Sequence, residues 1–145
     1  METAIIQLAT AFLSSFGFSM LFGLRRRFLL PASMGGLLCW GLYLGMDAWT
    51  HREFLSCLAA AAFAVVYAEI LARKLKTPAT LFVVPAILPL VPGGSLYYTM
   101  EAAVSGRLED ARAWGQKTLV VALAIAAGIS FVVALRELHT RRQGS

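Results

Sequence analysis

The stretch PAILPLVPGGSLYY, residues Pro85 to Tyr98, decides how this chain folds. Its prolines and its glycine pair are typical of a loop, yet the surrounding segment, Thr77 to Met100, contains no charged residue. A proline inside a helix removes a backbone donor and crowds the carbonyl of the preceding turn, so a continuous helix would leave polar groups unpaired. In lipid each unpaired group costs several kcal/mol. Broken backbone is therefore expected only where protein or a water-filled cavity surrounds it.

The composition is that of an integral membrane protein. Hydrophobic residues make up 59% of the 145 residues, charged residues only 14%, and the mean hydropathy is +0.71. Apolar runs long enough to cross a hydrocarbon layer of ~30 Å predict five helical spans, at approximately residues 3–24, 28–47, 54–72, 78–104 and 118–136. The predicted fold is an all-α integral membrane protein with about five transmembrane helices in a single domain, residues 1–145, and its fourth span is broken by proline and glycine.

The basic residues mark one side of the membrane. Nine of the thirteen Lys and Arg lie at alternate ends of the spans, namely Arg25, Arg26, Arg27, Arg73, Lys74, Lys76, Arg136, Arg141 and Arg142. By the positive-inside bias we predict that the N-terminus is outside and that residues 137–145 form a cytoplasmic tail. Because topology accounts for the net charge of +5, we expect no nucleic-acid partner.

Three further features concern packing. Leu108, Ala111 and Trp114 recur at helical spacing among charged residues, which predicts a short interfacial helix near residues 107–115. The GxxxG spacing of Gly41 and Gly45 predicts a helix contact face on the second span. The third span is rich in alanine, so we expect it to be central.

The break in the fourth span has two interpretations. It is either a kinked helix packed against small residues, with nothing bound, or two half-helices separated by a break at Gly93 and Gly94 that lines a binding site. In the second case free amides would favour an anionic group such as a carboxylate, and free carbonyls would favour an ammonium or a cation. The residues expected to line such a pathway are Pro85, Pro89, Pro92, Gly93, Gly94, Ser95, Tyr97 and Tyr98.

Two carboxylates lie close to membrane depth. Glu69 precedes Arg73 by four residues, the spacing of an ion pair on a helix surface, so it is either an interfacial partner of Arg73 or a gate or proton site. Glu101 follows Tyr97 by one helical turn and is either an outer-end carboxylate or a pathway residue.

The other reactive residue types show no site. Cys39 and Cys57 lack the paired spacing of a metal site or disulfide framework and are expected to be packing thiols. His51 and His139 have no partner at metal spacing. The spans contain neither a nucleophile with a base nor a carboxylate cluster, so we expect no metal, no cofactor and no enzymatic activity.

A family resemblance rests on two stretches. TPATLFVVPAILPLVPGGSLYYTM, Thr77 to Met100, resembles the hallmark segment of the threonine/serine exporter family, with its P-x3-PLVPG pattern followed by an aromatic residue. GFSMLFGLRRRFLLPASMGG, Gly17 to Gly36, is similar to the family's small-subunit pattern. In length and span number the chain resembles the small five-span subunit of the split two-subunit form, the YjjB-like half.

The resemblance implies a secondary transporter that exports small hydrophilic metabolites, either threonine and serine or a dicarboxylate such as succinate, driven by the proton gradient. It implies a bacterial cytoplasmic (inner) membrane location. It also implies that the chain is a half-transporter, whose partner is a larger five-span subunit with a cytoplasmic N-terminal region that this chain lacks. A homo-oligomer also remains open. The alternative function is a non-transporting structural or assembly subunit of a membrane complex.

Overall fold

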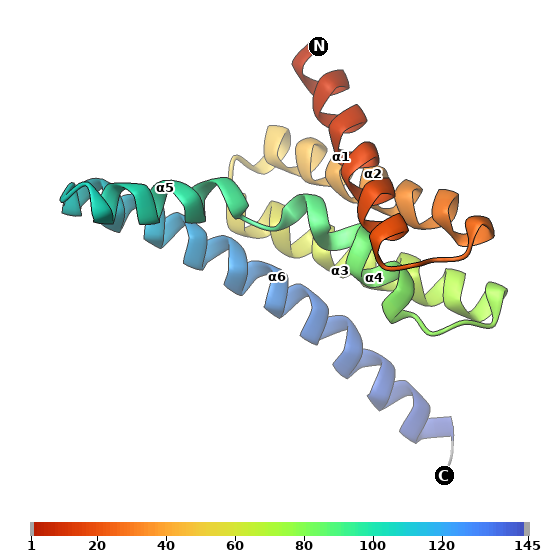
Figure 1. The fold of residues 1–145 in the computed structure, drawn as a ribbon. Coiled ribbons are helices and arrows are strands. Elements are labelled where there is room, and N and C mark those ends of the chain that lie inside the picture. Colours follow the sequence, from red (N-terminus) through yellow and green to blue (C-terminus); the bar gives the residue numbers. More distant parts are fainter. Residues whose placement is uncertain (1, 144–145) are drawn as a thin grey trace.

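The computed structural model describes residues 2–143, and the side chains of residues 3–138. Within these limits the chain is helical and contains no strand (Figure 1). The elements in order are α1 (Glu2–Leu21), α2 (Arg26–Thr50), α3 (Glu53–Leu75), α4 (Thr80–Ile87), the short 3-10 turn η1 (Leu88–Leu90), α5 (Gly93–Val104) and α6 (Leu108–Gln143).

Four of these helices, α1, α2, α3 and α6, are long and apolar enough to cross a membrane. The segments Thr80–Leu90 and Gly93–Val104 pass the same test together and are bent by 52° at the break between them, so they make a fifth crossing if they form one span. The predicted all-α membrane fold with a broken fourth span is confirmed. Where each span begins and ends in the bilayer stays a prediction.

Helix α3 is the centre of the bundle, as its alanine content predicts. It packs against α2, α4 and α6. Small side chains let neighbouring backbones approach closely in membranes, where lipid provides no hydrophobic drive for association. The alanines without exposed surface are Ala60, Ala61, Ala64 and Ala68.

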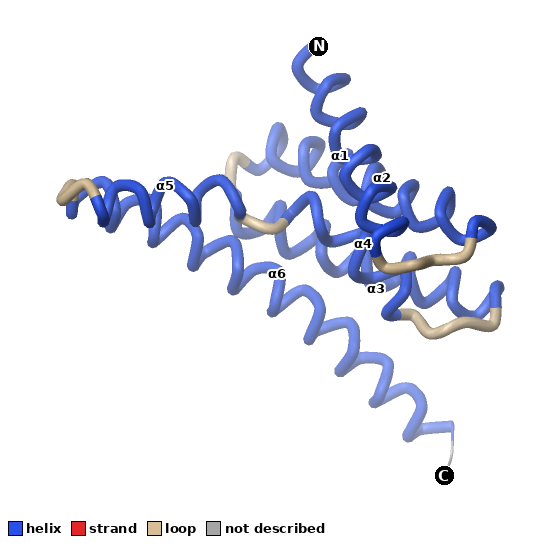
Figure 2. The backbone as a smooth tube through the Cα atoms, viewed as in Figure 1, coloured by secondary structure: helices blue, strands red, loops and turns tan. Residues whose placement is uncertain are grey.

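Helix α5 and the first turns of α6 form an arm that extends past the connection between α2 and α3 (Figures 1 and 2). Inside this arm Tyr98 of α5 lies against Trp114 of α6, with ring centroids 5.1 Å apart. Gly115 faces Thr99, and a Cβ built at Gly115 would lie 3.5 Å from the Thr99 methyl group. The second half of the broken crossing, α5, therefore leaves the bundle with α6 as its main neighbour.

The prediction of a separate interfacial helix near residues 107–115 is wrong. These residues form the beginning of α6, which runs without interruption for 36 residues. The chain turns before them, where Gly106 adopts a left-handed φ of 73°. After that turn no proline occurs, and a helix tolerates an isolated glycine such as Gly115 at about 1 kcal/mol. The residues expected to form a tail continue the same helix as far as Gln143.

The closest helix contacts of α2 lie at Gly35 and Gly36. A Cβ built at Gly36 would lie only 1.9 Å from the Ser15 Oγ of α1. Gly41 makes an ordinary contact, but a Cβ at Gly45 would meet nothing within 4 Å. The predicted contact face at the GxxxG spacing is therefore wrong at Gly45.

Ser15 also repairs the backbone of the broken crossing. Pro89 has no N–H, so it cannot bond to the carbonyl of Pro85 as a normal helical residue would. The Ser15 hydroxyl donates to that carbonyl instead, at 2.9 Å, and the bond is buried. A distant helix thus satisfies the polar group that proline leaves unpaired.

We expect Ser15→Ala to lower the free energy of unfolding by roughly 1–3 kcal/mol, because the buried carbonyl of Pro85 would lose its partner. Ser14→Ala is the matched control, since Ser14 Oγ bonds only within its own helix, to Ala11 at 3.0 Å. Unfolding in detergent, followed by labelling of the two buried free cysteines, measures both variants. Equal stability of the two variants would contradict the repair role of Ser15.

Candidate functional site

The break lies at Val91 and Pro92, between η1 and α5, and not at Gly93 and Gly94 as predicted, because both glycines belong to the first turn of α5. Val91 is extended, with ψ 125°, and the Gly93 N–H bonds back to its carbonyl at 2.7 Å. The N–H groups of Gly94 and Ser95 have no backbone partner among the residues that the structure describes. Because they belong to the first turn of α5, where the helix dipole is positive, they are available donors for an anionic group.

A cavity of about 230 Å³ opens beside this break. The residues predicted to line a pathway that reach it are Pro89, Pro92, Gly94, Ser95 and Tyr98. Its remaining lining is Leu90 and Val91 at the break itself, with Trp40, Tyr43, Glu53, Cys57, Trp114, Lys117 and Val121 from α2, α3 and α6. The tertiary structure therefore surrounds the break with polar and aromatic side chains from three other helices.

Three other predicted pathway residues lie outside this cavity. Pro85 is fully buried inside the bundle, where Ser15 holds its carbonyl. Gly93 begins α5 but does not line the cavity. Tyr97 is 65% exposed and packs edge-on against Tyr98.

The cavity contains an ion pair that joins α3 to α6. Lys117 Nζ lies 3.3 Å from Glu53 Oε1, and the two side chains are 48% and 33% exposed. The ammonium group also lies 5.9 Å from the centre of the Trp114 ring. Glu53 and Lys117 are the only charged side chains among the described residues that line this cavity.

Sequence reasoning missed both charged residues, although a signal existed. Each immediately precedes the beginning of a predicted span, and both of those spans begin on the same side of the membrane. Opposite charges at the starts of two packed helices lie at the same depth. That signal predicts a possible pair, but not that it would lie beside the break.

Trp40 contributes a buried donor without a partner. Its indole Nε1 has no exposed surface and no hydrogen-bond partner among the described residues. Its ring stacks on Tyr43, with centroids 4.9 Å apart. Trp40 and Pro89 also line a second cavity of about 230 Å³, which is bounded by α1. Trp40 and Pro89 therefore line both cavities. The Trp40 indole N–H could donate a hydrogen bond to a small polar molecule.

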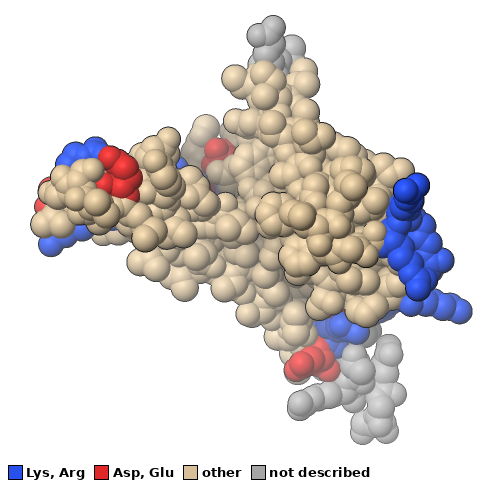
Figure 3. Space-filling model, in the orientation of Figure 1, with Lys and Arg blue, Asp and Glu red and all other residues tan. Residues whose placement is uncertain are grey.

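The cavity at the break lies near one end of the bundle. Glu53 and Cys57, which line it, belong to the first two turns of α3. Lys and Arg gather at the opposite end, where the α1–α2 and α3–α4 connections lie (Figures 1 and 3). The break is thus closer to the α2–α3 connection than to the basic end.

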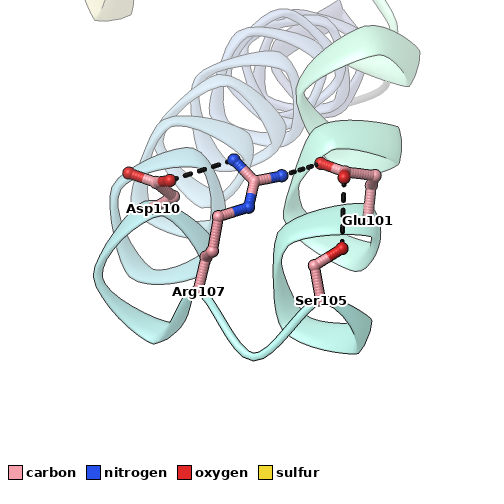
Figure 4. A network of polar contacts seen from close by, with 4 residues as sticks. All are labelled: Glu101, Ser105, Arg107 and Asp110. Carbon is pink, nitrogen blue, oxygen red and sulfur yellow. Dashed lines mark hydrogen bonds and ion pairs between the residues drawn. The ribbon is translucent and has the colours of Figure 1, made fainter.

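Glu101 lies at the tip of the arm and not at the cavity (Figure 4). Arg107 donates to its carboxylate and also to Asp110, at 3.1 Å, while the Ser105 hydroxyl donates to Glu101 at 3.2 Å. The hydrogen bond and charge of Glu101 raise the pKa of Arg107 above its ordinary value. This network holds the turn between α5 and α6.

Glu69 lies at the basic end, and its predicted pairing with Arg73 is wrong. Its carboxylate pairs with Arg136 of α6, at 3.1 Å, and the Glu69 side chain is only 15% exposed. Because α6 packs closely along α3, the carboxylate meets a partner on the neighbouring helix instead of one along its own.

Cys39 and Cys57 are free, buried thiols. Cys39 contacts the Ala60 carbonyl, with Sγ at 3.3 Å, which confirms the packing role predicted for it. Among the described residues no group of three His, Cys, Asp or Glu side chains is placed to hold a metal ion.

Comparison with known proteins identifies one match. The sequence profile of the family described as "Threonine/Serine exporter, ThrE" matches residues 7–135. No curated protein matches the chain. No solved structure matches it either.

Proposed function

The chain belongs to the threonine/serine exporter family of membrane transporters, and on that premise we propose that it is one half of a proton-driven exporter whose broken α4–α5 element lines the solute pathway. Its partner is a larger five-span subunit with a cytoplasmic N-terminal region. The complex lies in the bacterial inner membrane, with the N-terminus of this chain outside. The cavity at the break then belongs to the outer part of the route, and Glu69 at the basic end is a candidate proton site.

The observation that carries this proposal is the presence of both charges in the cavity at the break. An α-amino acid has an ammonium and a carboxylate group, and Glu53 and Lys117 provide one opposite charge for each. The amides of Gly94 and Ser95 add donors for the carboxylate, as helix N-termini commonly do. Succinate carries two carboxylates and would place one of them near Glu53. The site therefore favours threonine and serine over a dicarboxylate.

The size of the cavity supports a small solute. Its volume of about 230 Å³ is below the ~300–1,000 Å³ typical of pockets for drug-sized ligands. Threonine and serine add only a short hydroxyl side chain to the charged groups. The Trp40 indole N–H, which has no partner among the described residues, is suited to donate a hydrogen bond to the oxygen of such a hydroxyl.

Gly94→Ala tests the pathway directly. A Cβ at Gly94 would meet no atom within 4 Å, so alanine fits without strain at a residue that lines the cavity. We expect threonine export to fall several-fold, while stability is unchanged or rises by up to about 1 kcal/mol, because alanine favours a helix more than glycine does. Export of labelled threonine from vesicles containing both subunits is the measurement.

Gly45→Ala is the control for this experiment. Gly45 also has open space around it, but it does not line the cavity. Threonine export by the Gly45→Ala variant should match that of the wild type. If Gly94→Ala assembles with the partner and exports at the same rate as Gly45→Ala, the break does not line the pathway, and the chain is better described as a structural or assembly subunit.

A further inference from the structure

Another polar cavity, distinct from the two described above, lies at the basic end of the bundle, away from the break. It has a volume of about 460 Å³ and lies between the end of α3, the α3–α4 connection and α6. Its polar lining consists of Glu69, Arg73, Lys76, Thr77 and Arg136. None of these residues belongs to the cavity at the break.

The charge in this cavity is predominantly positive. Glu69 pairs with Arg136 at 3.1 Å. The other two cations, Arg73 and Lys76, have no ion pair with any side chain that the structure describes. Arg73 and Lys76 therefore line the same cavity, and neither is paired with a described carboxylate.

Thr77 provides an independent sign of a missing acceptor. Its hydroxyl oxygen has no exposed surface and no hydrogen-bond partner among the described residues. Buried polar groups are rarely left unpaired, and an orphaned one indicates an unseen partner. Thr77 lines the cavity, so a rotation of its side chain about Cα–Cβ would let this hydroxyl donate to an acceptor oxygen bound there.

The backbone around Thr77 is held in place. Lys76 has a left-handed φ of 50°, and its N–H and that of Thr77 both bond to the Ala72 carbonyl. This cap ends α3 and positions Lys76 and Thr77 together. Pro78 and Ala79, which lead into the positive N-terminal end of α4, line the same cavity.

We propose that this cavity is an anion site that binds a phosphate group. A phosphate has enough acceptor oxygens to contact two cations and the Thr77 hydroxyl at once, and charge-assisted bonds of this kind are the strong ones. Basic pockets between membrane helices commonly bind anionic headgroups on the cytoplasmic side. The group therefore comes either from an anionic phospholipid or from free phosphate. The site does not depend on the proposed export function.

Binding is measured in two arms with the purified full chain. One arm uses nanodiscs of phosphatidylcholine with or without phosphatidylglycerol and detects retained lipid by native mass spectrometry. The other uses lipid-depleted protein in detergent and titrates inorganic phosphate. Selective retention of phosphatidylglycerol identifies the lipid as the source, and binding in the detergent arm identifies the free anion.

Lys76→Gln is expected to weaken binding about tenfold in whichever arm shows it, because a charged hydrogen bond is lost. Lys74→Gln is the matched control: it removes the same charge from the adjacent basic segment, and Lys74 does not line the cavity. Thr77→Val should also weaken binding. Without ligand it should unfold at the same temperature or a higher one, since it removes an unpaired buried hydroxyl. This opposite change in binding and stability separates a binding role from a folding role.

Equal losses for Lys74→Gln and Lys76→Gln would show attraction to the basic surface as a whole and would overturn the site. Absence of binding in both arms would also overturn it, as would wild-type binding by Thr77→Val. Because these measurements concern binding and not transport, their failure leaves the proposed export function untouched.

Discussion

Lys117→Met is expected to lower threonine export by about tenfold to a hundredfold, because a hydrogen bond to a charged group contributes about 1.5–3 kcal/mol. Lys117 is the only positive side chain among the described residues that line the cavity at the break. Methionine keeps the length of the side chain but removes the proposed partner of the substrate carboxylate. Initial rates of export from vesicles that contain both subunits measure the effect.

Glu53→Gln tests the other half of the same pair. Loss of this carboxylate removes the proposed partner of the substrate ammonium, so threonine export should fall. It also removes the negative charge that disfavours a dicarboxylate, so the ratio of succinate to threonine export should rise. A fall in both substrates by the same factor would contradict the recognition of a zwitterion.

Arg112→Met is the matched control on the same helix. Arg112 is 76% exposed and pairs with Glu109 at 3.4 Å, away from the cavity. It carries the same charge as Lys117, so its replacement by methionine measures the general electrostatic effect on export. If Arg112→Met and Lys117→Met reduce export equally, Lys117 does not bind substrate.

Gly36→Ala is expected to lower the free energy of unfolding by about 2–4 kcal/mol. The new Cβ would lie 1.9 Å from Ser15 Oγ and 3.3 Å from the Pro85 carbonyl oxygen, so Ser15 must move and its bond to Pro85 is lost. Overpacking and the unpaired carbonyl each cost about 1–3 kcal/mol, and the better helix propensity of alanine offsets about 1 kcal/mol.

The reactivity of the buried thiols Cys39 and Cys57 with a labelling reagent reports this unfolding without any added probe. Gly45→Ala, on the same helix with open space around it, should be as stable as the wild type or slightly more stable. The double variant Ser15→Ala with Gly36→Ala should recover part of the loss, because a smaller side chain then faces the new methyl group. Equal stability of Gly36→Ala and Gly45→Ala would show that α1 does not pack at Gly36.

Much of the architecture follows from local features of the chain. Long charge-free runs predict the helices, and the three closely spaced prolines at positions 85, 89 and 92 predict the interruption, because each removes a backbone donor from the same short segment. The alanines of α3 predict its central position, because only small side chains let several helices approach one axis. The prediction of a short helix near residues 107–115 was wrong, because the sequence pattern of an interfacial helix is the same as that of one end of a longer helix.

Most partners of the site residues could not be predicted. The spacing along α3 offered Arg73 as one possible partner of Glu69, but the Glu69 carboxylate pairs with Arg136 of α6. Glu53 and Lys117 belong to different helices, and only the packing of α3 on α6 brings them together. The GxxxG spacing indicated Gly45 as a contact, whereas the crossing of α1 with α2 lies at Gly36.

The sequence by itself determined that this is a helical membrane protein with one interrupted crossing, because apolar length and missing backbone donors act locally and need no neighbour. Only the tertiary structure decided that Ser15 satisfies the Pro85 carbonyl, that an ion pair lies beside the break, and that a basic cavity lies at the opposite end. These features depend on where helices cross. Crossing points are set by the fit of side chains from distant segments, and no single segment carries that information.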